Sequence, residues 1–429
     1  MAFCKRLRRW LIAAGTITVA AAFFLGTFAH DASAARQSPK RHFTSQESHG
    51  RPDQYKRAQA RPRSARRFRV STDRIAALKK SSFWNKRPYQ FATPLIDGDR
   101  LFVGVDAGIF FAFDVRTNKR LWQQKTDGPV HGKAAYAEGT VYAADAEGHV
   151  YAMDAASGEK RWMSVLDTDI LATPLVEGGR IYVATMSGRL YALDAGTGTE
   201  LWHTNPQEKE FGFSIRRASS PVSGGGLIYY GTSSGELLAV RESDGRPAWS
   251  ELLGAQRSQV YDVDSSPLLY NGRLYASTAD GTLSCIEPAS GKILWTIDAG
   301  GVNDSISRDG KIFASGGGSL FSINPDSGLI FWQQDLEVPE ISSPAAGEHY
   351  VAVTSADEKI YLIDSDSGDI AYERYIGRGS YGDPIVSGDK IYLLSNTGKL
   401  YSFKVRELAQ KEKAAEKENV KQKNRGRKK

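Results

Sequence analysis

Short runs of alternating apolar and polar residues recur along most of the chain, with glycine-rich turns between them. RIYVAT at 180–185 and RLYALD at 189–194 are two examples. Alternation with a period of two is typical of strands that bury one face, and no helix-length amphipathic segment interrupts these runs. The pattern therefore predicts an all-β fold.

An internal repeat organises these strands. The segments YAMDAASGEKRW, YALDAGTGTELW and SCIEPASGKILW share one pattern that ends at an aromatic residue. A period near 40 residues is typical of β-propeller blades, four-stranded sheets that must stack on neighbours to bury both faces. The repeats predict an eight-bladed β-propeller over residues 81–406. The aromatic anchors are Trp84, Trp122, Trp162, Trp202, Trp249, Trp295, Trp332 and Tyr372, spaced 37 to 47 residues apart.

Most repeats carry a tight turn before the aromatic residue. An aspartate opens it, and a glycine that tolerates positive φ follows. Because these aspartates and the tryptophans recur at regular spacing, we interpret them as turn and inter-blade packing residues rather than as metal ligands or acid–base groups. The aspartates are Asp114, Asp154, Asp194 and Asp364.

The last repeat lacks its fourth strand. Residues 383–405 supply three strands, and a polar tail follows them. A strand-like segment around Trp84, SSFWNKR, lies at the other end of the repeats. We expect this N-terminal strand to complete the eighth blade and remove the open sheet edges.

The two ends of the chain differ from the repeats. Residues 1–34 join a basic start, an apolar stretch from Trp10 to Ala29 and a small-residue cleavage pattern, which predicts export to the periplasm or cell envelope. A cleaved signal peptide and an uncleaved membrane anchor are both open. Cys4 precedes the apolar stretch, so the chain is not an evident lipoprotein. Residues 35–80 are predicted to be a disordered basic linker and residues 407–429 a Lys-rich charged tail.

Charge is distributed unevenly between these parts. Residues 1–34, 35–80 and 407–429 carry net charges of +3, +11 and +5, which leaves −12 for the propeller within the total of +7. The basic linker is interpreted either as a solvated connection or as a tether to anionic lipid or envelope polymer. Nucleic acid is not an expected partner, because the chain is exported and its repeats are acidic.

Motifs of catalysis do not occur in the sequence. HExxH, GxSxG, P-loop and paired CxxC patterns are missing, which predicts a non-catalytic protein without a metal or cofactor. His131, His149 and His203 are scattered over strand ends and turns, and we interpret them as surface polar residues. Cys285 is interpreted as a small buried strand residue.

Two consecutive connections between repeats are longer than the others. The intervals from Trp202 to Pro221 and from Trp249 to Pro267 take 19 and 18 residues, whereas other intervals that end at such a proline take 10 to 12. Connections of this kind all emerge on one face of a propeller. We therefore expect two extended loops to lie side by side there, where repeat proteins commonly bind partners.

The two loop sequences, EFGFSIRRASSP and SQVYDVDSSP, contain residues typical of protein interfaces. Apolar anchors beside arginine, with carboxylates nearby, predict a partner-binding patch. Ion pairs between the loops are an alternative, and both can hold together. The candidate partner-binding residues are Phe213, Ile215, Arg216, Arg217, Tyr261, Asp262 and Asp264.

These loops and their surroundings resemble the BamB family of outer-membrane assembly factors. DVDSSP followed by GGVND is similar to a strand start and turn of that family, and FSIRRASSP is similar to its L-x-L-R-G-x-S-x-P stretch one blade earlier. The resemblance implies a monomeric periplasmic scaffold, closed by an N-terminal strand, that binds a POTRA domain of BamA and supports assembly of β-barrel outer-membrane proteins.

By this resemblance the candidate residues acquire individual roles. Phe213 and Ile215 stand at the family's two leucines, Arg216 at its arginine, and Asp262 and Asp264 at its acidic residues.

The sequence also departs from the family pattern. Phe213 and Arg217 replace the usual Leu and Gly, and the lipidated Cys of the family is missing. An envelope propeller with a different partner is one alternative. The other is a PQQ-dependent dehydrogenase-like quinoprotein, although those enzymes are longer and many use an adjacent cysteine pair.

Overall fold

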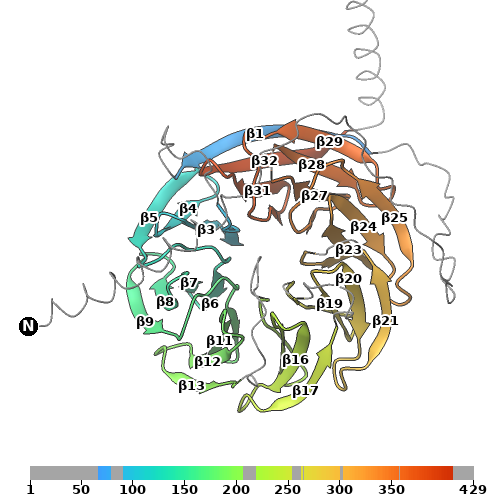
Figure 1. The fold of residues 1–429 in the computed structure, drawn as a ribbon. Coiled ribbons are helices and arrows are strands. Elements are labelled where there is room, and N and C mark those ends of the chain that lie inside the picture. Colours follow the sequence, from blue (N-terminus) through green and yellow to red (C-terminus); the bar gives the residue numbers. More distant parts are fainter. Residues whose placement is uncertain are drawn as a thin grey trace, which may run out of the picture. The chain divides into compact units, whose positions relative to one another are not determined.

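The alternating strands form eight four-stranded antiparallel sheets arranged in a ring, which confirms the eight-bladed β-propeller (Figure 1). The computed structural model describes residues 66–78, 90–205, 219–253, 262–263, 265–299, 303–356 and 358–408. All of them fall within one unit of the chain, 53–429. The apolar stretch of residues 10–29 lies outside these ranges. Within the ranges that the structure describes, no helix has the length and hydrophobicity needed to cross a bilayer.

The first four blades follow the chain in order, each with its first strand nearest the axis and its fourth at the rim (Figure 1). Their strands are β2 (Leu95–Asp97), β3 (Arg100–Val105), β4 (Ile109–Asp114) and β5 (Lys119–Lys125) in blade 1; β6 (Ala135–Ala137), β7 (Thr140–Ala144), β8 (His149–Asp154) and β9 (Lys160–Val165) in blade 2; β10 (Leu175–Glu177), β11 (Arg180–Ala184), β12 (Leu190–Asp194) and β13 (Glu200–His203) in blade 3; and β14 (Val222–Gly224), β15 (Leu227–Gly231), β16 (Glu236–Arg241) and β17 (Pro247–Leu252) in blade 4.

Blades 5 to 7 repeat this order, and blade 8 takes its fourth strand from the N-terminal side of the chain. Their strands are β18 (Leu268–Tyr270), β19 (Arg273–Ser277), β20 (Thr282–Ile286) and β21 (Ile293–Asp298) in blade 5; β22 (Ile306–Arg308), β23 (Lys311–Gly316), β24 (Ser319–Ile323) and β25 (Ile330–Asp335) in blade 6; β26 (Ala345–Ala346), β27 (Tyr350–Thr354), β28 (Lys359–Asp364) and β29 (Ile370–Tyr375) in blade 7; and β30 (Ile385–Ser387), β31 (Lys390–Leu394), β32 (Lys399–Glu407) and β1 (Phe68–Ala77) in blade 8.

The core lies between the blades rather than in one central cluster. Between blades 2 and 3, for example, Val150 and Ala152 of β8 belong to one buried cluster with Ile181 and Val183 of β11. The two middle strands of a blade face a neighbour on each side, so their residues are buried on both faces. Cys285, in β20, is buried as predicted.

The tryptophans of blades 1 to 6 pack against the following blade, as predicted. The Trp122 ring packs on Gly158 of blade 2, and its Nε1 donates to the Ala155 carbonyl at 3.1 Å. Trp162, Trp249, Trp295 and Trp332 make the equivalent hydrogen bond to the following blade.

The bond is missing at the boundary between blades 3 and 4. The Trp202 Nε1 makes no hydrogen bond within the described part of the chain, and the equivalent acceptor, the Glu242 carbonyl, accepts a hydrogen bond from Arg180 at 2.8 Å.

The recurrent aspartates close the turns between third and fourth strands, which confirms their structural interpretation. In blade 2, Asp154 Oδ1 accepts the N–H groups of Ala156 and Ser157, both at 2.9 Å. The same pair of bonds recurs at Asp114, Asp194 and Asp364.

An N-terminal strand closes the ring, as predicted, but the strand is β1, which the sequence analysis had placed in the linker. β1 pairs antiparallel with β32 from Phe68 opposite Glu407 to Ala77 opposite Lys399, so residues 68–77 are a strand rather than part of a disordered linker. The segment around Trp84 lies outside the described residues. β1 has no tryptophan and is rich in arginine, which concealed it; Phe68 nevertheless packs edge-on against Tyr350, with ring centroids 5.3 Å apart.

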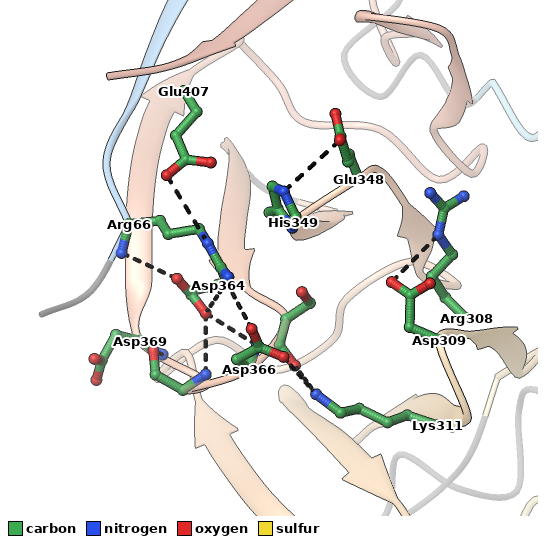
Figure 2. A network of polar contacts seen from close by, with 12 residues as sticks. Arg66, Arg308, Asp309, Lys311, Glu348, His349, Asp364, Asp366, Asp369 and Glu407 are labelled. Atoms are coloured by element: carbon green, nitrogen blue, oxygen red, sulfur yellow. Dashed lines mark hydrogen bonds and ion pairs between the residues drawn. The ribbon is translucent and has the colours of Figure 1, made fainter. Parts of the chain in front are cut away.

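Arg66, just before β1, ties blade 8 to blade 7, and Lys311 extends the same network to blade 6 (Figure 2). Its N–H donates to Asp364 at 3.0 Å, and its guanidinium donates to Asp366 at 2.8 Å. Lys311 of blade 6 donates to the other oxygen of Asp366 at 2.7 Å. This Arg66 network therefore holds the closing strand through three consecutive blades.

The Arg66 network should make stability depend on pH. Hydrogen bonds from Lys311 and then Arg66 lower the pKa of Asp366 from 3.8 to about 2. A carboxylate with a lowered folded-state pKa stabilises the fold above its unfolded pKa, and this contribution is lost as the pH falls through the folded value. We expect the Tm deficit of Lys311→Met to be complete above about pH 4 and to shrink toward about pH 2.

Thermal unfolding followed by circular dichroism over that pH range measures the deficit. The Asp366 side chain is 45% exposed, so solvent screening keeps the effect small. A deficit that stays constant with pH would contradict the role given to Asp366.

Candidate docking face and axial ring

The antiparallel order of the strands divides the loops between two faces of the propeller. We call connection face the one formed by the segments that join the fourth strand of a blade to the first strand of the next. The extended segments 204–221 and 253–267 belong to it, beside shorter ones such as 126–134 and 166–174. The opposite side, which carries the turns between third and fourth strands, is the turn face.

One residue per blade marks the point where the connection face meets the axis, just before each first strand. These residues differ in type but occupy equivalent positions, and several are joined by hydrogen bonds between neighbouring blades. We call them the axial ring: Thr93, Lys133, Thr173, Ser220, Ser266, Asp304, Ser343 and Asp383.

A relay of hydrogen bonds runs through half of the axial ring. The N–H of Thr173 donates to Ser220 Oγ at 3.0 Å, and the N–H of Ser220 donates to Ser266 Oγ at 3.3 Å. The N–H of Ser266 then donates to Asp304 Oδ1 at 2.5 Å. Ser220 and Ser266 end the two extended connections, so the relay ties the roots of both loops to each other and to blades 3 and 6.

The other side of the axial ring contains the charged residues Lys133 and Asp383. The Asp383 carboxylate accepts the N–H of Ser343 at 2.9 Å, and the N–H of Asp383 donates to Thr93 Oγ1 at 3.0 Å. Burial lowers the pKa of Lys133, and the charge of Asp383 opposes that shift. The ring side chains therefore serve mainly to join blades.

Of the seven predicted partner-binding residues, the structure describes Asp262. Its side chain is buried, with 4% of the residue exposed. The Asp262 carbonyl accepts the N–H of Ala279 at 2.8 Å, and the N–H of Val263 donates to Thr232 at 3.0 Å, so this stretch joins blades 4 and 5. The other six candidates, Phe213, Ile215, Arg216, Arg217, Tyr261 and Asp264, lie outside the described residues.

Two of the three histidines are less exposed than the sequence interpretation implied. His131 and His149 are partly buried, whereas His203 is exposed as predicted, and each packs at a turn or strand end beside a carboxylate. The pairs are His131 with Asp106, His149 with Asp145 and His203 with Glu200, at 2.7 to 3.3 Å.

Asp145, which the sequence analysis missed, is a buried carboxylate that accepts several hydrogen bonds on the connection face. Its carboxylate accepts the N–H of Gly128 and the hydroxyl of Tyr151, both at 2.8 Å. Burial opposes ionisation, but hydrogen bonds, led by the N–H of His149, hold the pKa of Asp145 below its usual value. The sequence signal that could have found Asp145 is its position directly after the second strand of its blade. Blades 3 to 5 have a threonine at the equivalent position, the last being Thr278.

The arrangement as a whole is suited to holding loops rather than a metal ion. Within the described ranges, no three His, Cys, Asp or Glu side chains are grouped so that they could hold a metal. The polar atoms at the axis and at Asp145 bond to backbone groups of adjacent blades. On the connection face, hydrogen bonds between blades therefore fix the points where the extended loops rejoin the propeller.

Comparison with known proteins gives a consistent family. The sequence profile of the outer membrane protein assembly factor BamB matches residues 106–319 and 316–411. The BamB proteins of Yersinia pestis and Shewanella oneidensis are 27% and 25% identical over 109 and 118 residues, about a quarter of this chain. The matched stretches span 28% and 30% of those relatives' lengths.

Solved structures add the fold. BamB from Moraxella catarrhalis superposes with a TM-score of 0.66 at 21% identity, covering 78% of this chain and 98% of that one. A europium-containing methanol dehydrogenase superposes with a TM-score of 0.59 at 15% identity, covering 78% and 84%. Identities this low establish a shared propeller fold alone, whereas the sequence profile covers most of the repeats. The chain belongs to the family of the outer membrane protein assembly factor BamB.

Proposed function

We propose that this protein is a non-catalytic scaffold of the cell envelope. Its connection face binds a POTRA domain of a BamA-like partner and so supports the assembly of β-barrel outer-membrane proteins. The observation that carries the proposal is the relay from Thr173 through Ser220 and Ser266 to Asp304, which braces the roots of both extended loops.

A braced base matters because ordering a loop on binding costs conformational entropy. Loops whose roots are fixed lose less freedom when a partner docks, so more of the contact energy appears as affinity. The two loops share a root through the Ser220–Ser266 hydrogen bond, which suits them to act as one surface. Their apolar, arginine and acidic residues are those enriched where binding energy concentrates.

The described residue Asp262 has a positioning role in this proposal. Only 4% of the residue is exposed, so we assign it to joining the second loop to blades 4 and 5 rather than to direct contact with a partner. Direct contacts are assigned to Phe213, Ile215, Arg216 and Arg217 of the first loop and to Tyr261 and Asp264 of the second.

A non-catalytic role is supported by the hydrogen bonds with which the axial ring joins neighbouring blades. Several of its polar side chains, such as Ser266 and Asp383, accept backbone N–H groups of neighbouring blades. The assembly-factor names of the BamB relatives point the same way.

The test is affinity capture from envelope extract with the full chain as bait. We expect the wild type to retain a BamA-like protein, and the double variant Arg216→Glu with Asp264→Lys to lose it, because both loops change charge where the partner docks. The matched control is Arg246→Glu with Asp326→Lys. Both control residues lie on the turn face with side chains 76% exposed, and the net charge change is the same. Equal capture by both variants would refute the assignment of the connection face.

A further inference from the structure

Both basic segments of the chain leave the propeller at one place on the turn face. Arg66, which begins β1, donates its N–H to Asp364 in a turn of that face, and the N–H of Leu408 donates to the Arg67 carbonyl at 2.9 Å. Residues 35–65 carry eight Lys/Arg against two Asp/Glu, and residues 409–429 carry nine against three. Positive charge from two distant parts of the sequence is therefore joined to the same corner.

The sheet at that corner contains two cross-strand pairs of like charge. In the register of blade 8, Arg69 lies opposite Arg406, and Lys404 lies opposite Lys390. Like charges placed directly across two strands destabilise a sheet. Lys404 also contacts Asp389 at 3.3 Å, which offsets one of these charges. We call Arg69, Lys390, Lys404 and Arg406 the basic corner.

Blade 1 extends the basic corner. Lys390 Nζ donates to the Val115 carbonyl at 3.4 Å, which places the turn after β4 beside blade 8. That turn and the start of β5 carry Arg116, Lys119 and Arg120, all exposed. Exposed cations on neighbouring elements produce a potential that attracts anionic surfaces.

The connection face has the opposite character. Its shorter connections and the adjoining strand ends carry exposed carboxylates, which an anionic surface would repel. They are Asp127, Asp167, Asp169, Asp335, Glu337 and Glu340. The propeller is thus polarised between its two faces.

We propose that the basic corner and the two basic segments bind the surface of an anionic phospholipid bilayer. The turn face then lies toward the membrane, and the connection face, with its docking loops, points away from it. A membrane is favoured over a soluble polyanion because the same chain carries the apolar stretch from Trp10 to Ala29, whose composition suits a signal peptide or a membrane anchor. Lys and Arg near an anionic leaflet each add attraction, and salt screens it.

The test uses the full chain and sedimentation with vesicles. One set is phosphatidylcholine alone, and the other contains phosphatidylglycerol. The ratio of the two affinities removes any charge-independent binding by residues 10–29. We expect the variant Arg69→Gln, Lys404→Gln, Arg406→Gln to lower this ratio on the order of tenfold at low salt, and the preference of the wild type to disappear at high salt.

The matched control neutralises three cations on the connection side, Lys125→Gln, Arg189→Gln and Lys359→Gln, with the same change in net charge. We expect its affinity ratio to stay within about twofold of the wild type. The corner variant removes two like-charge pairs and also the exposed Lys404–Asp389 ion pair, and these effects oppose each other. Its Tm should therefore stay close to that of the wild type, so weaker binding would not reflect unfolding. Equal losses in both variants would overturn the proposal, as would binding to soluble polyphosphate without any preference for anionic vesicles.

Discussion

Replacing Asp364 with Ala is expected to lower the free energy of unfolding by about 2–4 kcal/mol. Asp364 closes its own turn by accepting the N–H groups of Asp366 and Ser367. It also accepts the N–H of Arg66 and pairs with that guanidinium at 3.4 Å, with its own side chain only 3% exposed. Removing the carboxylate leaves the closing strand without its main anchor.

Asp194→Ala is the matched control for this effect. Asp194 accepts the same two turn N–H groups, from Gly196 and Thr197, but holds no segment from another blade. Chemical denaturation of both variants measures the difference, which isolates the contribution of ring closure. Equal losses in the two variants would show that Arg66 contributes nothing to closure.

Gly158→Ala is expected to destabilise the propeller by about 2–4 kcal/mol. Gly158 has φ of +77°, where a side chain is strained. A Cβ there would also lie 2.5 Å from Trp122 Cδ2, so the tryptophan would have to leave the adjoining blade. The loss therefore combines backbone strain with disruption of one inter-blade contact.

Gly139→Ala separates these two causes. Gly139 has φ of +75°, and a Cβ there would meet nothing within 4 Å. We expect it to cost only the strain of positive φ, about 1–2 kcal/mol. Urea denaturation of the two variants gives the comparison. If Gly139→Ala costs as much as Gly158→Ala, the tryptophan contact adds no measurable stability.

The blade repeat could be predicted from sequence because its residues do the same work in each copy. Trp122 and Trp162 donate to equivalent carbonyls of the next blade, and Asp154 and Asp194 close equivalent turns. The closing strand could not be found this way. β1 pairs with β32 as the other fourth strands pair with their third strands, but it lacks the tryptophan that most of them carry, and its anchor Arg66 is not part of the repeated sequence pattern.

The candidate site was predictable in part. Loop length located the extended connections, but the brace beneath them was missed because the axial ring changes residue type from blade to blade. Thr173, Ser220 and Asp304 share only the ability to receive or donate a hydrogen bond at one position. Asp145 was missed for a related reason. Its role comes from contacts with Gly128 and Tyr151, and these residues lie far in the sequence from the extended loops.

Photocrosslinking in the intact envelope tests the docking of a POTRA domain on the connection face most directly. A photoreactive phenylalanine analogue is placed at position 213, in the first extended connection, and separately at position 246, on the turn face. We predict a crosslink from position 213 to the POTRA region of a BamA-like protein and none from position 246. A crosslink to that region from position 246 alone, or from neither position, would contradict the account.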